Sequence, residues 1–231
     1  DLHKLRIDRA MALEIIRIGV PAGLQGMAFS LSNVVVQSSI NSFGSSVIVA
    51  GNSASNNIEN FVYIGMSAFT QACITFTSQN VGAQNLKRVK SIFNHSMVLT
   101  TLSAMLMGFL VWFFGESLLA FFTSDPAVVE AGMLRLFWVS MFLFLNGILD
   151  VFVSSLRGMG YSSLPTIVML VGICGVRLLW LLLIFPMHRT LTTIYLCFPL
   201  SWTVTSIVLG FIWLYCYRHM LRTNGQQAQN A

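Results

Sequence analysis

Charged side chains are scarce in this chain: Asp, Glu, Lys and Arg together make up 9% of its 231 residues. A soluble domain carries about 25% charged residues, so this chain lacks the charge that a water-facing surface needs. Its mean hydropathy is +0.74, and stretches without these four residue types extend over 18–58, 60–86, 91–115, 158–176 and 190–217. A membrane-spanning helix needs about 20 predominantly apolar residues. The sequence therefore predicts an integral membrane protein.

The alternating polar and apolar pattern of a membrane β-barrel is also missing, so we predict an all-α fold. Turn residues and charges divide the chain into a cytoplasmic linker or amphipathic segment at 1–14, a six-helix transmembrane lobe at 15–217 and a polar cytoplasmic tail at 218–231. The six expected spans are 15–40, 53–79, 91–114, 128–155, 163–186 and 192–217.

Motifs of catalysis, nucleotide binding and metal binding are absent as well. The chain contains no H-E-x-x-H, no G-x-S-x-G, no phosphate-binding loop and no His pair at metal-ligand spacing. Its four Cys residues have no C-x-x-C spacing, and we interpret them as small helix-packing residues. We therefore expect no enzymatic activity, no cofactor and no metal site.

The distribution of Lys and Arg predicts the orientation in the membrane. With six spans, both termini lie on one side together with the second and fourth loops. That side carries ten Lys and Arg residues, and the opposite side carries only Arg189. Cytoplasmic loops are enriched in Lys and Arg, so we expect both termini to be cytoplasmic. The net charge of +5 then follows from topology and gives no reason to expect a nucleic-acid partner.

Polar residues line one face of the second expected span. They recur every three or four residues, which is the helical period: Asn56, Asn60, Tyr63, Ser67, Gln71, Thr75 and Ser78. The first and fourth spans carry shorter stripes that contain Asn33 and Gln37, and Asn146 and Asp150, respectively. Three helices are therefore expected to turn polar faces toward one another or toward a watery cavity. Hydrogen bonds between helices are the alternative role for these residues.

Two carboxylates within the spans, Glu59 and Asp150, need a special explanation. An ionised side chain at the bilayer centre costs about 2.5–3.5 kcal/mol even on the mildest scale. Two interpretations stay open for each acid, a role in ion coupling or substrate binding and a structural ion pair. From the helical rise, we expect Glu59 at the depth of two intramembrane charge partners, Arg135 and Arg177, and Asp150 in the inner half. The cavity-lining candidates are Asn33, Gln37, Asn60, Tyr63 and Asn146.

Nearly the whole chain, from about Ile18 to the last span, resembles the C-terminal half of bacterial multidrug and toxic compound extrusion (MATE) transporters. The resemblance is carried by GVPAGLQGMAFSLSNVVVQSSINSFGSSVIVAGNSASNNIENFVY, TFTSQNVGAQNLKRVK and SSLRGMGYSSLPTIVMLVG. It implies one six-helix lobe of a twelve-helix transporter in the bacterial plasma (inner) membrane. The implied function is secondary active efflux of small lipophilic organic cations in exchange for protons or sodium ions. The implied partners are membrane lipids and either the N-terminal six-helix lobe of the same protein, absent here, or a second copy of the chain.

One departure from the family leaves the coupling ion open. Sodium-coupled members carry an acid in the middle of the first helix of this lobe, where this chain has Phe29. Two alternative functions also stay open. The first is a flippase of a lipid-linked precursor in a related fold, for which only Arg135 and Arg177 could supply a cationic groove. The second is a non-transporting truncated membrane module that pairs with another chain.

Overall fold

The computed structural model describes residues 8–229, apart from the side chains of residues 10, 14, 17, 18, 21, 22 and 224–229. Over this range the chain is helical and contains no strand, so the prediction of an all-α fold is confirmed. The helices in chain order are α1 (Arg9–Asn41), α2 (Ser46–Gly82), α3 (Leu86–Phe113), α4 (Gly115–Ala120), α5 (Pro126–Ser140), α6 (Leu143–Gly158), α7 (Ser163–Met169), the π-helical turn η2 (Leu170–Gly175), α8 (Val176–Leu183) and α9 (Leu191–Gln229).

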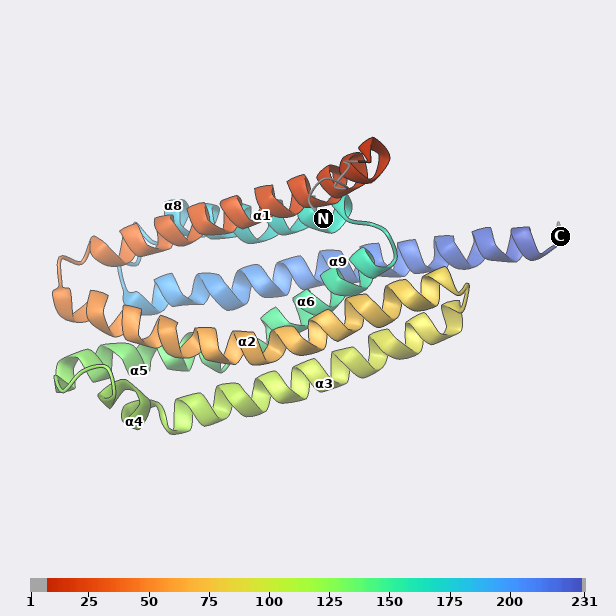
Figure 1. The fold of residues 1–231 in the computed structure, drawn as a ribbon. Coiled ribbons are helices and arrows are strands. Elements are labelled where there is room, and N and C mark those ends of the chain that lie inside the picture. Colours follow the sequence, from red (N-terminus) through yellow and green to blue (C-terminus); the bar gives the residue numbers. More distant parts are fainter. Residues whose placement is uncertain (1–7, 230–231) are drawn as a thin grey trace, which may run out of the picture.

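The long helices run side by side, and α9 projects beyond the rest of the bundle at its C-terminal end (Figure 1). Helix α2 packs against α3, α5 and α6, while α1 packs against α7, η2 and α8. Several helices begin at a side chain that accepts a hydrogen bond from the first turn, as Ser45, Asn85 and Asp125 do for α2, α3 and α5. Gly44, with φ of +66°, makes the turn before α2 in a conformation that glycine adopts at little cost.

The helix bounds differ from the expected organisation in five places. The expected span at 128–155 is two helices, α5 and α6, which meet at a bend of 41°. The loop before it contains the short helix α4, and the expected span at 163–186 contains η2. Helix α1 begins within the expected linker, of which residues 1–7 lie outside the described part, and α9 continues into the expected tail.

Three helical stretches among the described residues are long and apolar enough to cross a membrane: α3, the continuous helix from Ser163 to Leu183, and α9 up to Thr223. The bent pair α5–α6 makes a fourth if it is taken as one span. Helices α1 and α2 are not among them, although they contain 33 and 37 residues. The polar stripe lowers the mean hydropathy of α2, so length and apolar composition alone do not mark α2 as a membrane span.

The distribution of side chains is that of a membrane protein, with apolar groups outside and charges inside. Phe61 and Phe211 are each 72% exposed, whereas Arg135 and Arg177 are 5% and 2% exposed. Apolar groups on the outer surface meet lipid at no cost, but a charge inside the bundle must find its partners within the protein.

Helices α2 and α5 approach so closely that only glycine fits at one contact. A Cβ atom at Gly51 would lie 2.7 Å from the Val128 carbonyl oxygen and 2.8 Å from the Gly132 nitrogen. One turn along α2, the Ser55 hydroxyl donates to the Gly132 carbonyl oxygen at 2.9 Å. Small residues of this kind allow helix backbones to pack closely in membranes.

We therefore predict that Gly51→Ala destabilises the protein by about 1–3 kcal/mol, because the added methyl group meets backbone atoms that have no room to move. Gly65→Ala on the same helix is the matched control, since a Cβ atom there would meet only the Met107 methyl carbon at 3.9 Å. Thermal unfolding of the purified protein in detergent measures both variants. Equal melting temperatures for the two variants would contradict the predicted close contact.

Candidate functional site

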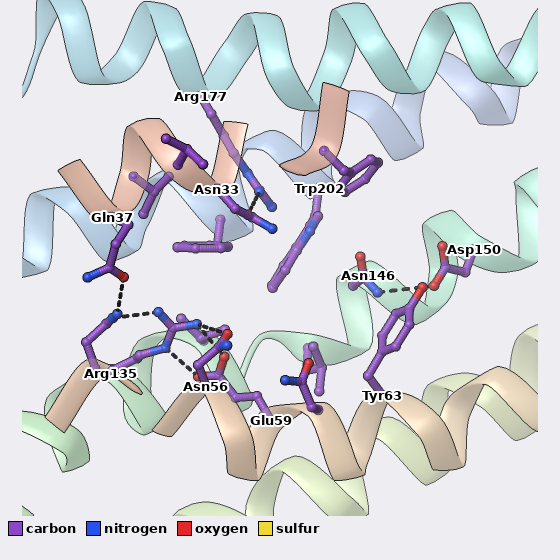
Figure 2. A pocket seen from close by; sticks show the side chains of 18 of the residues that line it. Asn33, Gln37, Asn56, Glu59, Tyr63, Arg135, Asn146, Asp150, Arg177 and Trp202 are labelled. Carbon is purple, nitrogen blue, oxygen red and sulfur yellow. Dashed lines mark hydrogen bonds and ion pairs between the residues drawn. The ribbon is translucent and has the colours of Figure 1, made fainter. Parts of the chain in front are cut away.

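A cavity of about 800 Å³ is lined by residues of α1, α7, α8 and α9 and by residues of α2, α5 and α6. Every residue that the sequence singled out as an ion-coupling, cavity-lining or charge-partner candidate lines it (Figure 2). These residues are Asn33, Gln37, Glu59, Asn60, Tyr63, Arg135, Asn146, Asp150 and Arg177. The polar stripes of three separate helices thus meet around one space.

Glu59 and Arg135 form a bidentate ion pair that joins α2 to α5. The Arg135 Nη2 and Nε atoms donate to Glu59 Oε2 and Oε1 at 2.7 and 3.0 Å. Both side chains are buried. This fork geometry is the strongest arrangement of an arginine and a carboxylate. It supports the interpretation of Glu59 as one partner of a structural ion pair.

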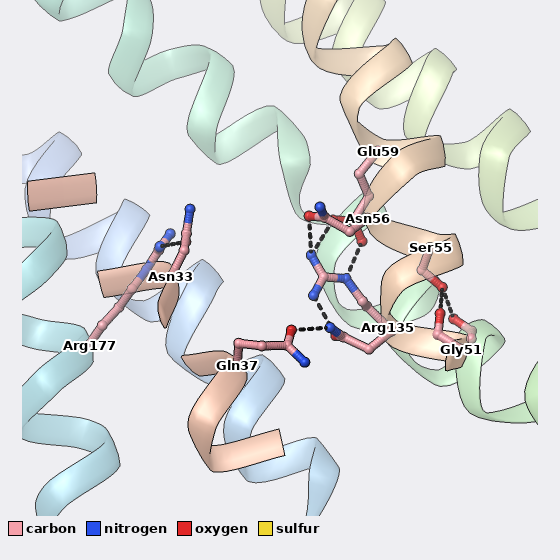
Figure 3. A network of polar contacts seen from close by, with 10 residues as sticks. Asn33, Gln37, Gly51, Ser55, Asn56, Glu59, Arg135 and Arg177 are labelled. Atoms are coloured by element: carbon pink, nitrogen blue, oxygen red, sulfur yellow. Dashed lines mark hydrogen bonds and ion pairs between the residues drawn. The ribbon is translucent and has the colours of Figure 1, made fainter. Parts of the chain in front are cut away.

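Three amide side chains complete this network (Figure 3). Arg135 also donates to Asn52 Oδ1 at 2.6 Å and to Asn56 Oδ1 at 3.0 Å. Asn52 in turn donates from Nδ2 to Gln37 Oε1 at 2.8 Å, which extends the network to α1. A buried ion pair needs such additional hydrogen bonds to offset the loss of water around both charges.

Asp150 lies elsewhere in the cavity and has a different environment. It accepts one hydrogen bond, from Asn146 Nδ2 at 3.2 Å, and Figure 2 shows the Tyr63 ring directed toward the same place. Glu59–Arg135 is the one salt bridge among residues 8–229 with described side chains. Asp150 therefore has no ion-pair partner there, and Arg157, two turns further along α6, donates instead to Gln25 Oε1 at 2.6 Å.

Arg177, expected at the depth of Glu59, is not part of the Glu59 network. It lies on α8, where Nε donates to Ser201 Oγ at 3.2 Å and Nη1 to Asn33 Oδ1 at 3.4 Å. Its guanidinium carbon lies 4.4 Å from the centre of the Phe198 ring. Arg177 is thus held by neutral groups.

Sequence reasoning missed several residues of the cavity wall. Asn52 precedes the expected start of the second span, yet it continues the polar stripe because it lies four residues before Asn56. That spacing could have identified it. Phe198 and Trp202 also line the cavity, but nothing in the sequence distinguishes them from aromatic residues that face lipid. Among the described residues, no group of three or more His, Cys, Asp or Glu side chains could hold a metal ion.

The described helices form a bundle of membrane-protein character around a polar, charged cavity, and comparison with known proteins gives the family. The MatE family profile matches residues 21–182, so the chain belongs to this family. The expected fold class, one lobe of a MATE-like helical membrane transporter, is confirmed.

Two curated relatives and one solved structure illustrate the similarity. The probable multidrug resistance protein NorM of Thermotoga maritima is 26% identical over 165 residues, which cover 71% of this chain and 35% of the relative. The probable multidrug resistance protein YpnP of Bacillus subtilis is 29% identical over 128 residues, which cover 55% of this chain and 28% of the relative. A crystal structure of a MATE protein in complex with MaL6 superposes with a TM-score of 0.83 at 16% identity, covering 96% of this chain and 50% of that one. The chain spans about half the length of this solved transporter.

The ion pair gives a prediction about stability. We expect Glu59→Gln to destabilise the protein by about 3–5 kcal/mol, because Arg135 is then buried without its counter-charge. The double variant Glu59→Gln/Arg135→Gln should recover part of the loss, since it leaves no unpaired charge. Thermal unfolding in detergent measures both, with the exposed Glu130→Gln as control. The structural role would be wrong if Glu59→Gln melted at the wild-type temperature.

Proposed function

We propose that this chain is the C-terminal lobe of a secondary active multidrug efflux transporter, which exchanges lipophilic organic cations for protons or sodium ions. One observation carries the proposal: Asp150 is a carboxylate without an ion-pair partner among the described residues, and it lines an 800 Å³ cavity in a chain of the MatE family. Cavities of about 300–1,000 Å³ accommodate drug-sized ligands.

Asp150 can couple the two fluxes because one carboxylate binds one cation at a time. A bound organic cation leaves when a proton or a sodium ion takes its place, and the incoming substrate later displaces that ion. Asn146 fixes the orientation of the Asp150 carboxylate through its hydrogen bond. The aromatic rings of Phe29 and Trp202 also line the cavity, and aromatic rings attract organic cations.

Glu59 has a different role in this proposal. Both of its carboxylate oxygens are occupied by Arg135, so it shapes the cavity wall and leaves ion exchange to Asp150. A second lobe completes the site, since paired-repeat transporters bind substrate at the repeat interface near the midplane. That lobe is the N-terminal half of the same protein or a second copy of this chain.

We expect Asp150→Asn in the full-length protein to reduce efflux of organic cations roughly tenfold or more, because the neutral amide no longer attracts the cation or the coupling ion. Dye uptake into inverted membrane vesicles, where export from the cell becomes inward transport, measures the effect under an imposed proton or sodium gradient and identifies the coupling ion. Glu116→Gln, in the exposed first turn of α4, is the control. Unchanged efflux and ion dependence in Asp150→Asn would exclude this role, and efflux by this chain expressed alone would exclude the need for a second lobe.

The proposed orientation, with both termini cytoplasmic in the bacterial plasma membrane, has its own test. A cysteine at Ser124, in the loop before α5, should react with an impermeant thiol reagent added outside intact cells. A cysteine at Ala83, between α2 and α3, should react only after the cells are opened. The four native Cys residues are buried and free, which keeps the background low. The reverse labelling pattern would invert the topology.

A further inference from the structure

Arg177 is a buried cation without an acidic counterpart in the described part of the chain. It is 2% exposed and lines the cavity, but it belongs to no salt bridge there. A guanidinium carries five N–H donors. Two atoms of Arg177 donate to neutral acceptors, at 3.2 and 3.4 Å.

Arg135, in the wall of the same cavity, shows how this chain satisfies a buried arginine. It has a bidentate carboxylate and two asparagine oxygens within 2.6–3.0 Å. Arg157 is less buried and donates to Gln25 at 2.6 Å. Of the three cavity arginines, Arg177 thus has the longest contacts and the deepest burial. An unpaired buried charge is costly, so a missing anion is the simplest explanation of this arrangement.

The fold directs Arg177 into the cavity from α8. The π-helical turn η2 ends two residues before it, and π-turns within helices are frequent at functional sites. Ser201 and Phe198 of α9 contact one side of the guanidinium, and the other side faces the cavity (Figure 2). On the same helix, the indole nitrogen of the cavity-lining residue Trp202 is buried without an acceptor among the described residues.

The two carboxylates of the cavity do not serve as its counter-charge. Glu59 is engaged by Arg135. Asp150 lies on the opposite side of the cavity from Arg177 (Figure 2). Arg157 also lacks a salt bridge among the described side chains, but it lies on α6, two turns from Asp150. Arg177 and Asp150 are therefore an unpaired cation and an unpaired carboxylate at separate positions in the cavity.

We propose that Arg177 forms an anion subsite that takes the carboxylate of an amphoteric aromatic substrate while Asp150 takes the cationic group of the same molecule. The inference rests on the proposed efflux function and narrows its substrate class. The guanidinium fork matches the planar geometry of a carboxylate. The single positive charge of Arg177 balances a single negative charge, which favours a carboxylate over a doubly charged phosphate.

Two dyes that differ in one group test the proposal. Rhodamine 110 carries a free carboxylate beside its cationic ring system, and rhodamine 123 is its methyl ester. Uptake of each dye into inverted membrane vesicles is measured for the full-length wild-type protein and for Arg177→Gln, Arg177→Lys and Asp150→Asn. Arg189→Gln is the matched control, because Arg189 contacts the Phe185 ring and does not line the cavity.

Arg177→Gln should lower rhodamine 110 transport about tenfold, the effect of losing a hydrogen-bonded charge, and leave rhodamine 123 transport within about twofold. Arg177→Lys should give an intermediate loss of rhodamine 110 transport, since lysine keeps the positive charge but lacks the planar pair of N–H donors of a guanidinium. Asp150→Asn should impair both dyes, and Arg189→Gln neither.

Other outcomes overturn the proposal. Equal loss of both dyes in Arg177→Gln, with normal protein levels, would mean that Arg177 balances a carboxylate of the second lobe. No change in either dye would mean that it binds no anion. If Arg177→Gln fails to accumulate, the test uses the wild-type protein alone. We then expect the concentration that gives half-maximal transport to be lower for rhodamine 110 than for rhodamine 123. The reverse order would contradict the proposed subsite. Wild-type transport of neither dye would count against the efflux function itself, and the subsite would fall with it.

Discussion

The absence of water inside a bilayer is the constraint on which this structure depends. Every charge within the bundle must be neutralised or solvated by the protein itself. The Arg135–Glu59 pair satisfies this requirement between two helices whose paired residues are separated by 76 positions in the chain. Its amide ligands continue the network to α1 through Gln37, so one ion pair helps to position three of the cavity walls.

The same two helices are joined by a second kind of contact. Gly51 and Gly132 bring the backbones of α2 and α5 together, and Glu59 follows Gly51 two turns later on α2. Close backbone packing gives dispersion contacts but carries no charge, whereas the ion pair is directional. Together they make α2 and α5 a single rigid wall. Arg177 and Asp150, which lack ion-pair partners in the described chain, lie on the elements outside this wall, where a ligand can engage them.

The sequence was enough to predict which polar residues line the cavity, but it did not predict which arginine pairs with Glu59. The helical period placed the polar stripes on single faces, and helices with polar faces have to meet, so the nine candidate residues line one cavity. Depth alone could not separate Arg135 from Arg177 as the partner of Glu59, because pairing also depends on how each helix is rotated about its axis. Residues 141–142, where α5 and α6 meet, include no Pro or Gly, so the local sequence did not predict the bend. Phe198 and Trp202 required the tertiary structure, since aromatic residues occur on lipid-facing and cavity-facing surfaces alike.

The π-helical turn η2 has a consequence for how such a cavity can change during evolution. A π-turn holds its hydrogen bonds between residues five apart, one more than in an α-helix, and each residue of an α-helix turns the chain by about 100°. The wider turn of η2 therefore takes up one extra residue. Loss of one codon within residues 170–175 would restore an ordinary helical turn and leave Arg177 facing the cavity. In an ordinary α-helix the same loss would rotate every later residue by about 100°. The turn is thus a position at which the chain can change its length while Arg177 keeps its place in the cavity wall.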